Sequence, residues 1–310
     1  MVPCYETRYP KTMGNSDHPH RATVWRLRTR TLTCAEQPLL MGIVNVTPDS
    51  FSDGGRFLET QAAVDQAVRL VEDGADLVDI GGESTRPYSQ AVAADEERRR
   101  VLPVIEALAA KISVPISIDT SKAIVAREAL AAGAEIINDV TGLAGDPDML
   151  PLAVESGAGL CAMHMQGTPQ TMQDHPHYVN VVTEIYDYLR RRRDVLLAAG
   201  VARERICLDP GIGFGKTHEH NLELMQTCQQ FLNLGCPILV GHSRKGFLGK
   251  LLGDSTLDRD AATLGSALSL ARQGVQVLRV HEVRCLREAL LAFIACGGTS
   301  VGSTASEKTQ

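Results

Sequence analysis

The sequence has few aromatic residues and no excess of positive charge, and both shortages bear on its partners. Aromatic residues make up 4% of the 310 residues, with one Trp, and 31 Lys and Arg against 37 Asp and Glu give a net charge of −6. A nucleic-acid-binding surface needs clustered basic residues, and it commonly stacks bases on aromatic rings. We therefore expect no nucleic-acid partner.

Long apolar runs and paired cysteine motifs are also missing. No run approaches the roughly 18 consecutive apolar residues of a membrane span, and no basic-then-apolar signal opens the chain. The eight cysteines are scattered without a CxxC pair, which argues against a disulfide framework and against a cysteine-rich zinc site. We expect a cytoplasmic protein with no membrane partner, whose 44% of apolar residues suffice for a globular core.

The main pattern that is present is a regular alternation of two kinds of segment. Eight short runs rich in branched aliphatic residues read as buried parallel strands. They are LLMGIVNV (39–46), ADLVDIG (75–81), VPISIDT (114–120), AEIINDV (134–140), GLCAMHM (159–165), RICLDPG (205–211), CPILVGHS (236–243) and VQVLRVHE (275–282). Segments of helical period separate them, such as 60–74 and 121–133, and both of these end in glycine.

Strand alternating with helix eight times predicts an α/β fold, a (β/α)₈ TIM barrel. The competing architecture is a doubly wound open sheet. That fold usually carries a GxGxxG turn after its first strand, where this chain has VTPDSFSDGG. The barrel is favoured.

The domain organisation follows from the same pattern. We expect a flexible N-terminal tail over residues 1–23, because this stretch lacks periodicity. A single barrel domain is predicted over 24–298, and it begins with a strand or hairpin at 24–34, where apolar and polar residues alternate. The Ser-, Thr- and Gly-rich end, 299–310, is predicted to be disordered.

Each apolar run ends in polar side chains, and in a barrel the carboxyl ends of the strands carry the catalytic groups. These side chains are Asn45, Glu83 to Arg86, Asp119, Asn138 with Asp139, His164, Asp209, Ser243 to Lys245, and Arg279 with His281. Carboxylates with an amide suit a ligand that has an amidine-like donor edge, and the cationic groups suit phosphate. Asn45 is a neutral oxygen ligand compatible with Mg²⁺. The expected substrate is a planar, nitrogen-rich heterocycle bearing a diphosphate.

Simpler structural interpretations compete at several of these positions. Asp119 and Asp209 could instead cap the helices that follow them, and Asn138 could bond to loop backbone. We expect His164 and His242 to be packed histidines rather than ligands. The HEH triplet at 218–220 lacks a third partner at helix spacing, so a zinc site is not expected there.

Eight motifs together resemble the dihydropteroate synthase family. They are NVTPDSFSDGG (45–55), GGESTRP (81–87), SIDTSK (117–122), IINDV (136–140), MHMQGTPQTMQ (163–173), LDPGIGFGK (208–216), GHSRKGFLG (241–249) and LRVHEV (278–283). The resemblance runs in order from about residue 38 to 290. It implies transfer of the 7,8-dihydropterin-6-ylmethyl group from its diphosphate to 4-aminobenzoate, which yields 7,8-dihydropteroate and diphosphate in folate biosynthesis. It further implies Mg²⁺ as cofactor, a homodimer and a dissociative mechanism.

The resemblance also assigns residues by motif. The pterin diphosphate would contact Thr85, Asp119, Asn138, Met163, Asp209, Phe214, Lys245, Arg279 and His281. The aminobenzoate would contact Phe51, Ser52, Thr85, Arg86, Pro87 and Ser243. Asn45 would bind the metal, and the catalytic residues would be Asp49, Lys245, Arg279 and His281. Two mobile loops are implied, one over 47–55 and one that carries Thr85 and Arg86.

Three positions depart from the commoner family pattern. Tyr88 stands where glycine is frequent, so the second loop is expected to be stiffer than usual. Gly246 replaces a common serine, which removes a possible hydroxyl contact to aminobenzoate or to its sulfonamide mimics. His242 stands where methionine is frequent, and we expect it to be tolerated in packing.

Two rival functions remain open at this point. A class I aldolase type would use Lys245 for a Schiff base, which requires a lowered pKa. A non-catalytic pterin-binding paralogue, or a corrinoid-linked methyl-transfer module, would keep Asp119, Asn138 and Asp209 but lose the first loop, 47–55, and the SRK motif, 243–245. Both of these features are present, so catalysis is favoured.

Overall fold

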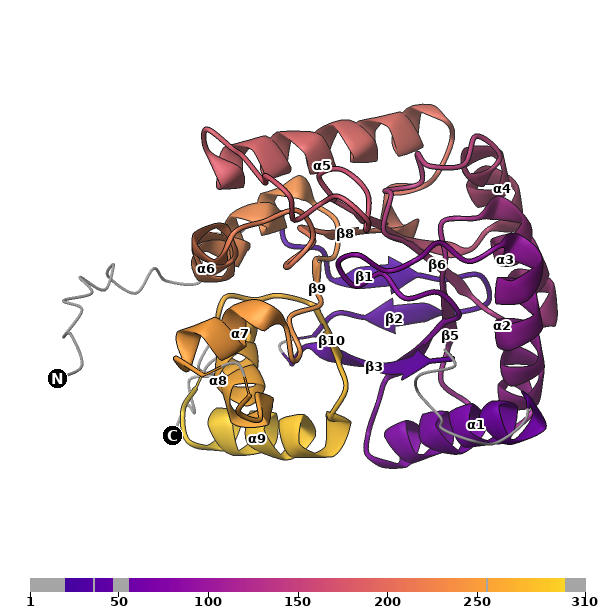
Figure 1. The fold of residues 1–310 in the computed structure, drawn as a ribbon, viewed down its shortest axis with the longest axis horizontal. Helices are drawn as coiled ribbons and strands as arrows, with labels where there is room; N and C mark the ends of the chain where they lie inside the picture. The colour runs from indigo at the N-terminus through magenta and orange to yellow at the C-terminus, as the bar shows by residue number, and fades with distance from the viewer. Residues whose placement is uncertain (1–19, 36, 47–55, 255, 299–310) are drawn as a thin grey trace, which may run out of the picture.

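The fold is known from a computed structural model, which describes residues 20–35, 37–46, 56–254 and 256–298 (Figure 1). Its centre is an eight-stranded parallel sheet of β3 (Leu39–Asn45), β4 (Leu77–Gly81), β5 (Ile116–Asp119), β6 (Ile136–Asp139), β7 (Gly159–Met163), β8 (Ile206–Asp209), β9 (Leu239–Val240) and β10 (Val277–Val280). Each predicted strand is present. β10 pairs with β3, and a parallel bridge between Leu208 and Ile238 joins β8 to the segment that enters β9. The ring is thus closed, and the prediction of a TIM barrel is confirmed.

Helices cover the outside of the barrel (Figure 1). They are α1 (Arg56–Glu72), α2 (Ala94–Ala109), α3 (Ala123–Ala132), α4 (Met149–Ser156), α5 (Val181–Ala198), α6 (His218–Thr227), α7 (Gly246–Leu251), α8 (Asp260–Arg272) and α9 (Val283–Ala295), with short 3₁₀ turns at Arg203–Arg205 and Cys228–Leu234. The helices predicted at 60–74 and 121–133 are α1 and α3. Gly74 and Gly133 follow them with φ of +98° and +121°, a backbone region open mainly to glycine.

The strands alternate between two environments because successive side chains of a strand point to opposite faces. Inward-facing residues near the amino ends form one apolar floor, which includes Met41, Leu77, Ile136, Cys161, Cys207, Leu239 and Val277. The intervening residues, such as Val78, Leu160 and Leu278, belong to the larger cluster against the helices. The interior is therefore apolar at its amino end, which leaves the carboxyl end for polar groups.

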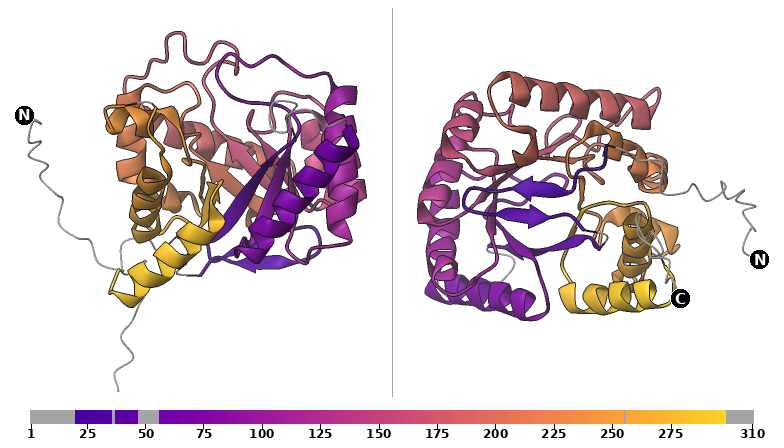
Figure 2. Two further views of the ribbon diagram at one scale, coloured as in Figure 1. Left: turned by 60° about the horizontal axis from the view of Figure 1, so that its bottom comes forward. Right: turned by 180° about the vertical axis from the view of Figure 1, so that it is seen from behind.

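The predicted N-terminal hairpin is present and closes the floor. β1 (Val24–Arg26) pairs antiparallel with β2 (Thr31–Thr33), and Figure 2 shows the pair lying across one end of the barrel. Trp25 is fully buried there and donates Nε1–H to the carbonyl of Arg205 at 3.2 Å. Ahead of the hairpin, Arg21 donates to the carbonyls of Gly274 and Cys34, so the chain already contacts the barrel at that residue.

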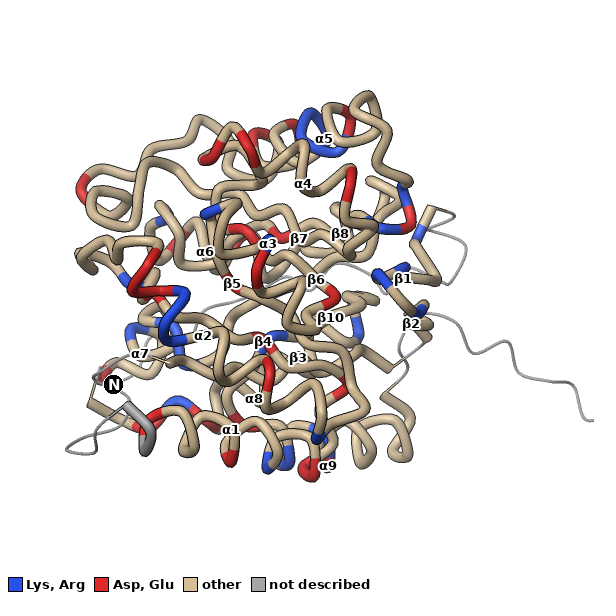
Figure 3. Tube along the Cα trace, turned by 90° about the vertical axis from the view of Figure 1, so that its right-hand side faces the viewer, with Lys and Arg blue, Asp and Glu red and all other residues tan. Residues whose placement is uncertain are grey.

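No helix within the described ranges is long and apolar enough to cross a membrane. Lys and Arg are interspersed with Asp and Glu over the side of the molecule that Figure 3 shows, and no large one-sign face is visible there.

Candidate active site

The polar residues at the strand ends converge in the mouth of the barrel. Arg279 on β10 donates a hydrogen bond from Nη2 to Asp119 Oδ2 on β5 at 2.8 Å, although these two strands are not neighbours. Its Nε donates to Asp79 Oδ2 on β4 at 2.6 Å, and Asn138 Nδ2 on β6 donates to the same oxygen at 3.0 Å. The guanidinium and its two carboxylates therefore connect three strands across the interior, and the Asn138 amide adds a fourth.

Asp79 is a residue of this cluster that the sequence analysis missed. It lies in the middle of β4 rather than at its end, and its side chain is fully buried. Its second oxygen, Oδ1, has no hydrogen-bond partner among the described residues. The sequence did contain a signal. Asp79 lies two residues after Leu77 and two before Gly81, and alternate residues of a strand face the same side, so Asp79 faces the barrel interior as they do.

Asp209 and Lys245 occupy the opposite side of the mouth. Asp209 Oδ1 accepts the backbone N–H of Gly211 at 2.7 Å, which braces the loop after β8. The Lys245 ammonium lies over the ring of Phe214, 4.0 Å from its centroid, in a cation–π contact. Loop and lysine are thus held against each other beside the carboxylate.

Ser243 and His281 form a bonded pair. Ser243 Oγ accepts the backbone N–H of His281 at 3.3 Å and lies 3.0 Å from its Nδ1. Oγ can also donate its own hydrogen to Nδ1, and in that tautomer of the neutral ring Nε2 carries the proton. Ser243, which the resemblance assigned to aminobenzoate, therefore also orients His281.

Burial shifts the pKa of Asp119, Asp209, Lys245 and His281 towards the neutral form of each group. Desolvation raises the pKa of Asp119 to about 7; Arg279 opposes this shift and Asp79 adds to it. Desolvation likewise raises the pKa of Asp209 to about 6. Desolvation and then the charge of Arg279 lower the pKa of Lys245 to about 8 and that of His281 to about 4. Such shifts are typical of functional sites, because a ligand with complementary charge can reverse them.

The helix-capping interpretation of the two aspartates is wrong. Asp119 bonds Arg279, while the first residue of α3, Ala123, donates its N–H to Asp146 at 2.8 Å. Asp209 braces its own loop, and α6 is capped instead by Thr217.

The alternative for Asn138 fails in the same way, because the Asn138 amide binds the Asp79 side chain rather than loop backbone. His164 and His242 are packed as expected. His164 Nδ1 lies 3.0 Å from Lys216 Nζ, and His242 Nε2 lies 3.2 Å from the carbonyl of Thr263.

Lys216 is a second buried residue that the sequence analysis did not single out. Its ammonium donates to the carbonyl of Phe214 at 2.9 Å and contacts His164, so it joins the loop after β8 to the end of β7. Desolvation lowers its pKa to about 7. Gly211 allows this close approach: a Cβ placed there would lie 1.9 Å from the carbonyl oxygen of His164.

The remaining predicted residues are more dispersed. Met163 and Phe214 share a small apolar cluster with Val140 and Met172. Thr85, Arg86 and Pro87 lie in the loop between β4 and α2, where Arg86 and Pro87 are exposed. Asp49, Phe51 and Ser52 fall outside the described residues.

Asn45 ends β3, half-buried, and its amide has no hydrogen-bond partner among the described residues. No group of three or more His, Cys, Asp and Glu able to hold a metal occurs within the described ranges. His220 of the HEH triplet contributes to the capping box of α6.

Comparison with known proteins identifies the family of the chain. The chain matches the family described as "Pterin binding enzyme" over residues 41–281. It is 42% identical to the dihydropteroate synthase of Haemophilus influenzae, a match covering 83% of this chain and 94% of that protein. It is 45% identical to that of Escherichia coli strain K12, covering 82% and 89%.

Solved structures give the same result. The dihydropteroate synthase of Xanthomonas albilineans with 4-aminobenzoic acid superposes with a TM-score of 0.82 at 43% identity, covering 89% of this chain and 98% of that one. The same enzyme in complex with 7,8-dihydropteroate gives a TM-score of 0.79 at 41% identity, covering 87% and 98%.

Proposed function

The chain belongs to the pterin-binding enzyme family, and on this premise we propose that it catalyses the dihydropteroate synthase reaction. The reaction joins (7,8-dihydropterin-6-yl)methyl diphosphate to 4-aminobenzoate and releases diphosphate, in folate biosynthesis. The observation that carries this proposal is the cluster in the mouth of the barrel. There Arg279 bonds to both Asp79 and Asp119, and Asn138 bonds to Asp79. Full-length relatives at more than 40% identity support it.

Pterin recognition is assigned to the carboxylates and the amide. Asp119, Asp209 and Asn138 would pair with the ring's N–H donors and acceptors, since a carboxylate accepts two parallel N–H bonds well. Lys245 would donate to a ring acceptor. Met163, Phe214 and Thr85 would line the pocket, and Arg279 would lie against the ring face.

The diphosphate would lie beside the charged guanidinium of Arg279 and the neutral imidazole of His281. Arg279 and His281 would bind its oxygens, and the Nε2–H of His281 is the donor available for this contact because Nδ1 faces Ser243. In this dissociative mechanism the bond between the pterin methylene carbon and oxygen breaks first, and its electron pair leaves with the diphosphate. The arylamine nitrogen then attacks the methylene cation with its lone pair, which forms the C–N bond, and releases its proton to water. Groups that stabilise the departing charge accelerate such a step, and no protein nucleophile is required.

Asn45 fits the expected Mg²⁺. Its amide oxygen is a neutral ligand at the edge of the mouth, without a partner among the described residues, and Mg²⁺ commonly combines few protein ligands with phosphate and water. When bound, the ion would neutralise diphosphate charge.

The aminobenzoate pocket is assigned to Thr85, Arg86, Pro87 and Ser243, together with Phe51 and Ser52. Arg86 is the natural partner for the aminobenzoate carboxylate, because its guanidinium makes no ion pair within the described part of the chain. Asp49 would act at the reacting carbon. Gly246 offers no hydroxyl here, so the contacts to sulfonamide mimics would be fewer.

A homodimer in the cytoplasm is the proposed biological form. Leu251, Leu252 and Leu257 are exposed on α7 and the segment after it, and a partner subunit would cover them. All seven cysteines of the described residues are free, in keeping with a reducing compartment. Sedimentation equilibrium tests the dimer, and charged substitutions at Leu251 and Leu252 should dissociate it.

The test of the reaction is a turnover assay with both substrates and Mg²⁺, following diphosphate release and dihydropteroate formation. Arg279→Met should lower kcat/KM by about 100-fold, the loss seen when one charge-stabilising donor is removed. Arg272→Met, on the exposed last turn of α8, is the matched control and should behave as the unsubstituted chain.

Folded protein that releases no diphosphate above background would overturn the proposed function. Borohydride treatment with a carbonyl substrate separates the aldolase alternative, since the lowered pKa of Lys245 would also suit a Schiff base. We expect no covalent adduct.

A further inference from the structure

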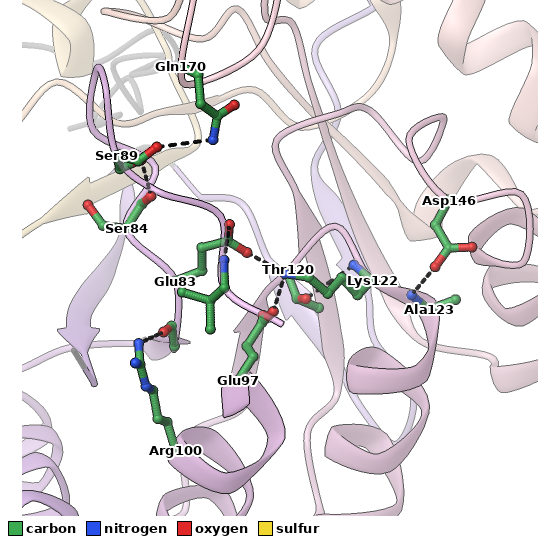
Figure 4. A network of polar contacts seen from close by, with 12 residues as sticks. Glu83, Ser84, Ser89, Glu97, Arg100, Thr120, Lys122, Ala123, Asp146 and Gln170 are labelled. Atoms are coloured by element: carbon green, nitrogen blue, oxygen red, sulfur yellow. Dashed lines mark hydrogen bonds and ion pairs between the residues drawn. The ribbon is translucent and has the colours of Figure 1, made fainter. Parts of the chain in front are cut away.

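A partly buried ion cluster of Lys122, Glu83 and Glu97 lies beneath the loop between β4 and α2, outside the residues assigned to pterin (Figure 4). Lys122, in the loop after β5, forms an ion pair with Glu83 and lies 2.6 Å from Glu97 Oε2. Glu97 lies in the first turn of α2 with no exposed side-chain surface, and its Oε1 has no hydrogen-bond partner among the described residues. A buried carboxylate without a counter-ion is strongly unfavourable, so Lys122 is what stabilises Glu97 there.

Glu83 connects the two ends of the loop. It lies two residues after the end of β4, and its Oε1 accepts the backbone N–H of Val92 at 3.2 Å, one residue before the N-cap of α2. Arg100 of α2 also donates to the carbonyl of Gly82 at 2.9 Å. The base of the 83–92 loop is therefore fixed to α2 and, through Lys122, to the loop after β5.

The tip of the same loop rests on the segment after β7. The N–H of Tyr88 donates to the carbonyl of Pro169 at 3.0 Å, and Gln170 Nε2 donates to the carbonyl of Ser89 at 3.0 Å. Tyr88 has a φ of +64°, a left-handed conformation that costs a non-glycine residue free energy and persists only where its surroundings enforce it. Fixed ends and a docked tip supply that enforcement.

The loop carries Thr85 and Arg86, two and three residues after Glu83. The positive charge of Arg86 contributes to the lowered pKa of Lys245 and of His281, so the guanidinium acts on the mouth of the barrel. A loop released at its base would no longer hold this charge in place.

We propose that Lys122 is a positioning residue for 4-aminobenzoate: by pairing with Glu83 and Glu97 it fixes the base of the 83–92 loop and so places Thr85 and Arg86 at the barrel mouth. The identity of the substrate in this inference rests on the proposed function, whereas the anchoring of the loop does not.

The test compares Lys122→Met and Lys122→Arg with Lys111→Met, a matched control at an exposed lysine after α2. The first readout is the rate of chymotryptic cleavage after the exposed Tyr88, identified by a fragment that begins at Ser89. The second is the KM of each substrate. Lys122→Met should speed cleavage and raise the KM for aminobenzoate by about ten-fold, as for the loss of a partly buried ion pair, while the KM for pterin diphosphate, whose pocket takes only Thr85 from this loop, should rise less. In Lys122→Arg the cleavage rate and the KM for aminobenzoate should both lie close to those of the unsubstituted chain. Lys111→Met should change neither the cleavage rate nor the KM.

Because Lys122→Met leaves Glu97 unpaired and could impair folding, Glu83→Gln is the second variant. It removes the charge pair but keeps an oxygen for the Val92 N–H, and it should show the same pattern. Cleavage and aminobenzoate KM both unchanged in a folded variant would overturn the proposal, as would an equal rise in both KM values without faster cleavage. If the unsubstituted chain has no synthase activity, the proposed function fails, while the cleavage rates still decide whether Lys122 anchors the loop.

Discussion

Replacing Asp79 by asparagine tests the central cluster most directly. Asp79 Oδ2 accepts from Arg279 Nε at 2.6 Å and from Asn138 Nδ2 at 3.0 Å. Asparagine keeps the shape and one acceptor oxygen but removes the charge, so the charge-assisted hydrogen bond from the neutral Asn138 amide becomes a neutral one, and Arg279 loses one of its two ion pairs. Charged hydrogen bonds contribute about 1.5–3 kcal/mol and neutral ones about 0.5–1.5 kcal/mol. The expected loss of about 1.5 kcal/mol lowers the affinity for pterin diphosphate by about ten-fold.

The same substitution should move the pH dependence of binding in a defined direction. Ionised Asp119 is the form that accepts N–H groups, so pterin affinity is lost as the pH falls through its pKa, which is raised to about 7. Asp79 contributes to that raised pKa by its negative charge. In Asp79→Asn the pKa of Asp119 falls, and the loss of affinity moves to lower pH even though the affinity at alkaline pH is weaker.

Calorimetric titration with a pterin ligand, from about pH 5 to about pH 9, measures both effects. Asp95→Asn, at a highly exposed carboxylate in the first turn of α2, is the control and should leave the affinity and its pH dependence unchanged. If Asp79→Asn loses affinity for the pterin ligand at the same pH as the unsubstituted chain, the electrostatic coupling of Asp79 to Asp119 is refuted. Unchanged affinity would remove Asp79 from the site.

Three further predictions address other parts of the molecule. Gly211→Ala should lower the free energy of unfolding by several kcal/mol more than Gly157→Ala. Both glycines have φ near +70°, but only a Cβ at 211 meets the carbonyl of His164. Equal losses of stability in urea unfolding would contradict this. Lys216, with its pKa lowered to about 7 in the folded chain, binds fewer protons there than in the unfolded chain, so stability should rise from about pH 7 to about pH 10; Lys216→Met should flatten this rise, and parallel curves would exclude the effect. Asn45→Ala should raise the Mg²⁺ concentration for half-maximal turnover by about ten-fold, and an unchanged requirement would remove Asn45 from the metal site.

The architecture was predictable because parallel strands in a barrel leave two regular marks on a sequence. Each strand is apolar on successive residues, and each ends in a polar group at the same rim, so Asp119, Asn138, Asp209 and Arg279 could be placed together without coordinates. What the sequence did not indicate was their pairing. Arg279 bonds across the barrel to Asp119, and that partner depends on the curvature of the closed sheet.

The missed residues share a physical reason. Asp79 is buried within a strand, and a carboxylate in an apolar run is stabilised only by partners distant in sequence, here Arg279. Lys122 and Lys216 likewise find their partners through tertiary structure. Tyr88 was recognised as unusual from the resemblance alone, and its positive φ is the conformation that glycine would adopt without strain.

The single tryptophan gives the molecule a built-in optical probe that is separate from its chemistry. Trp25 is buried in the hairpin that closes the amino end of the barrel, whereas the charged groups gather at the carboxyl end. Its emission should therefore follow loss of the hairpin contact and remain silent when a ligand enters the opposite end. Melting and ligand occupancy can then be recorded in one cuvette as independent signals.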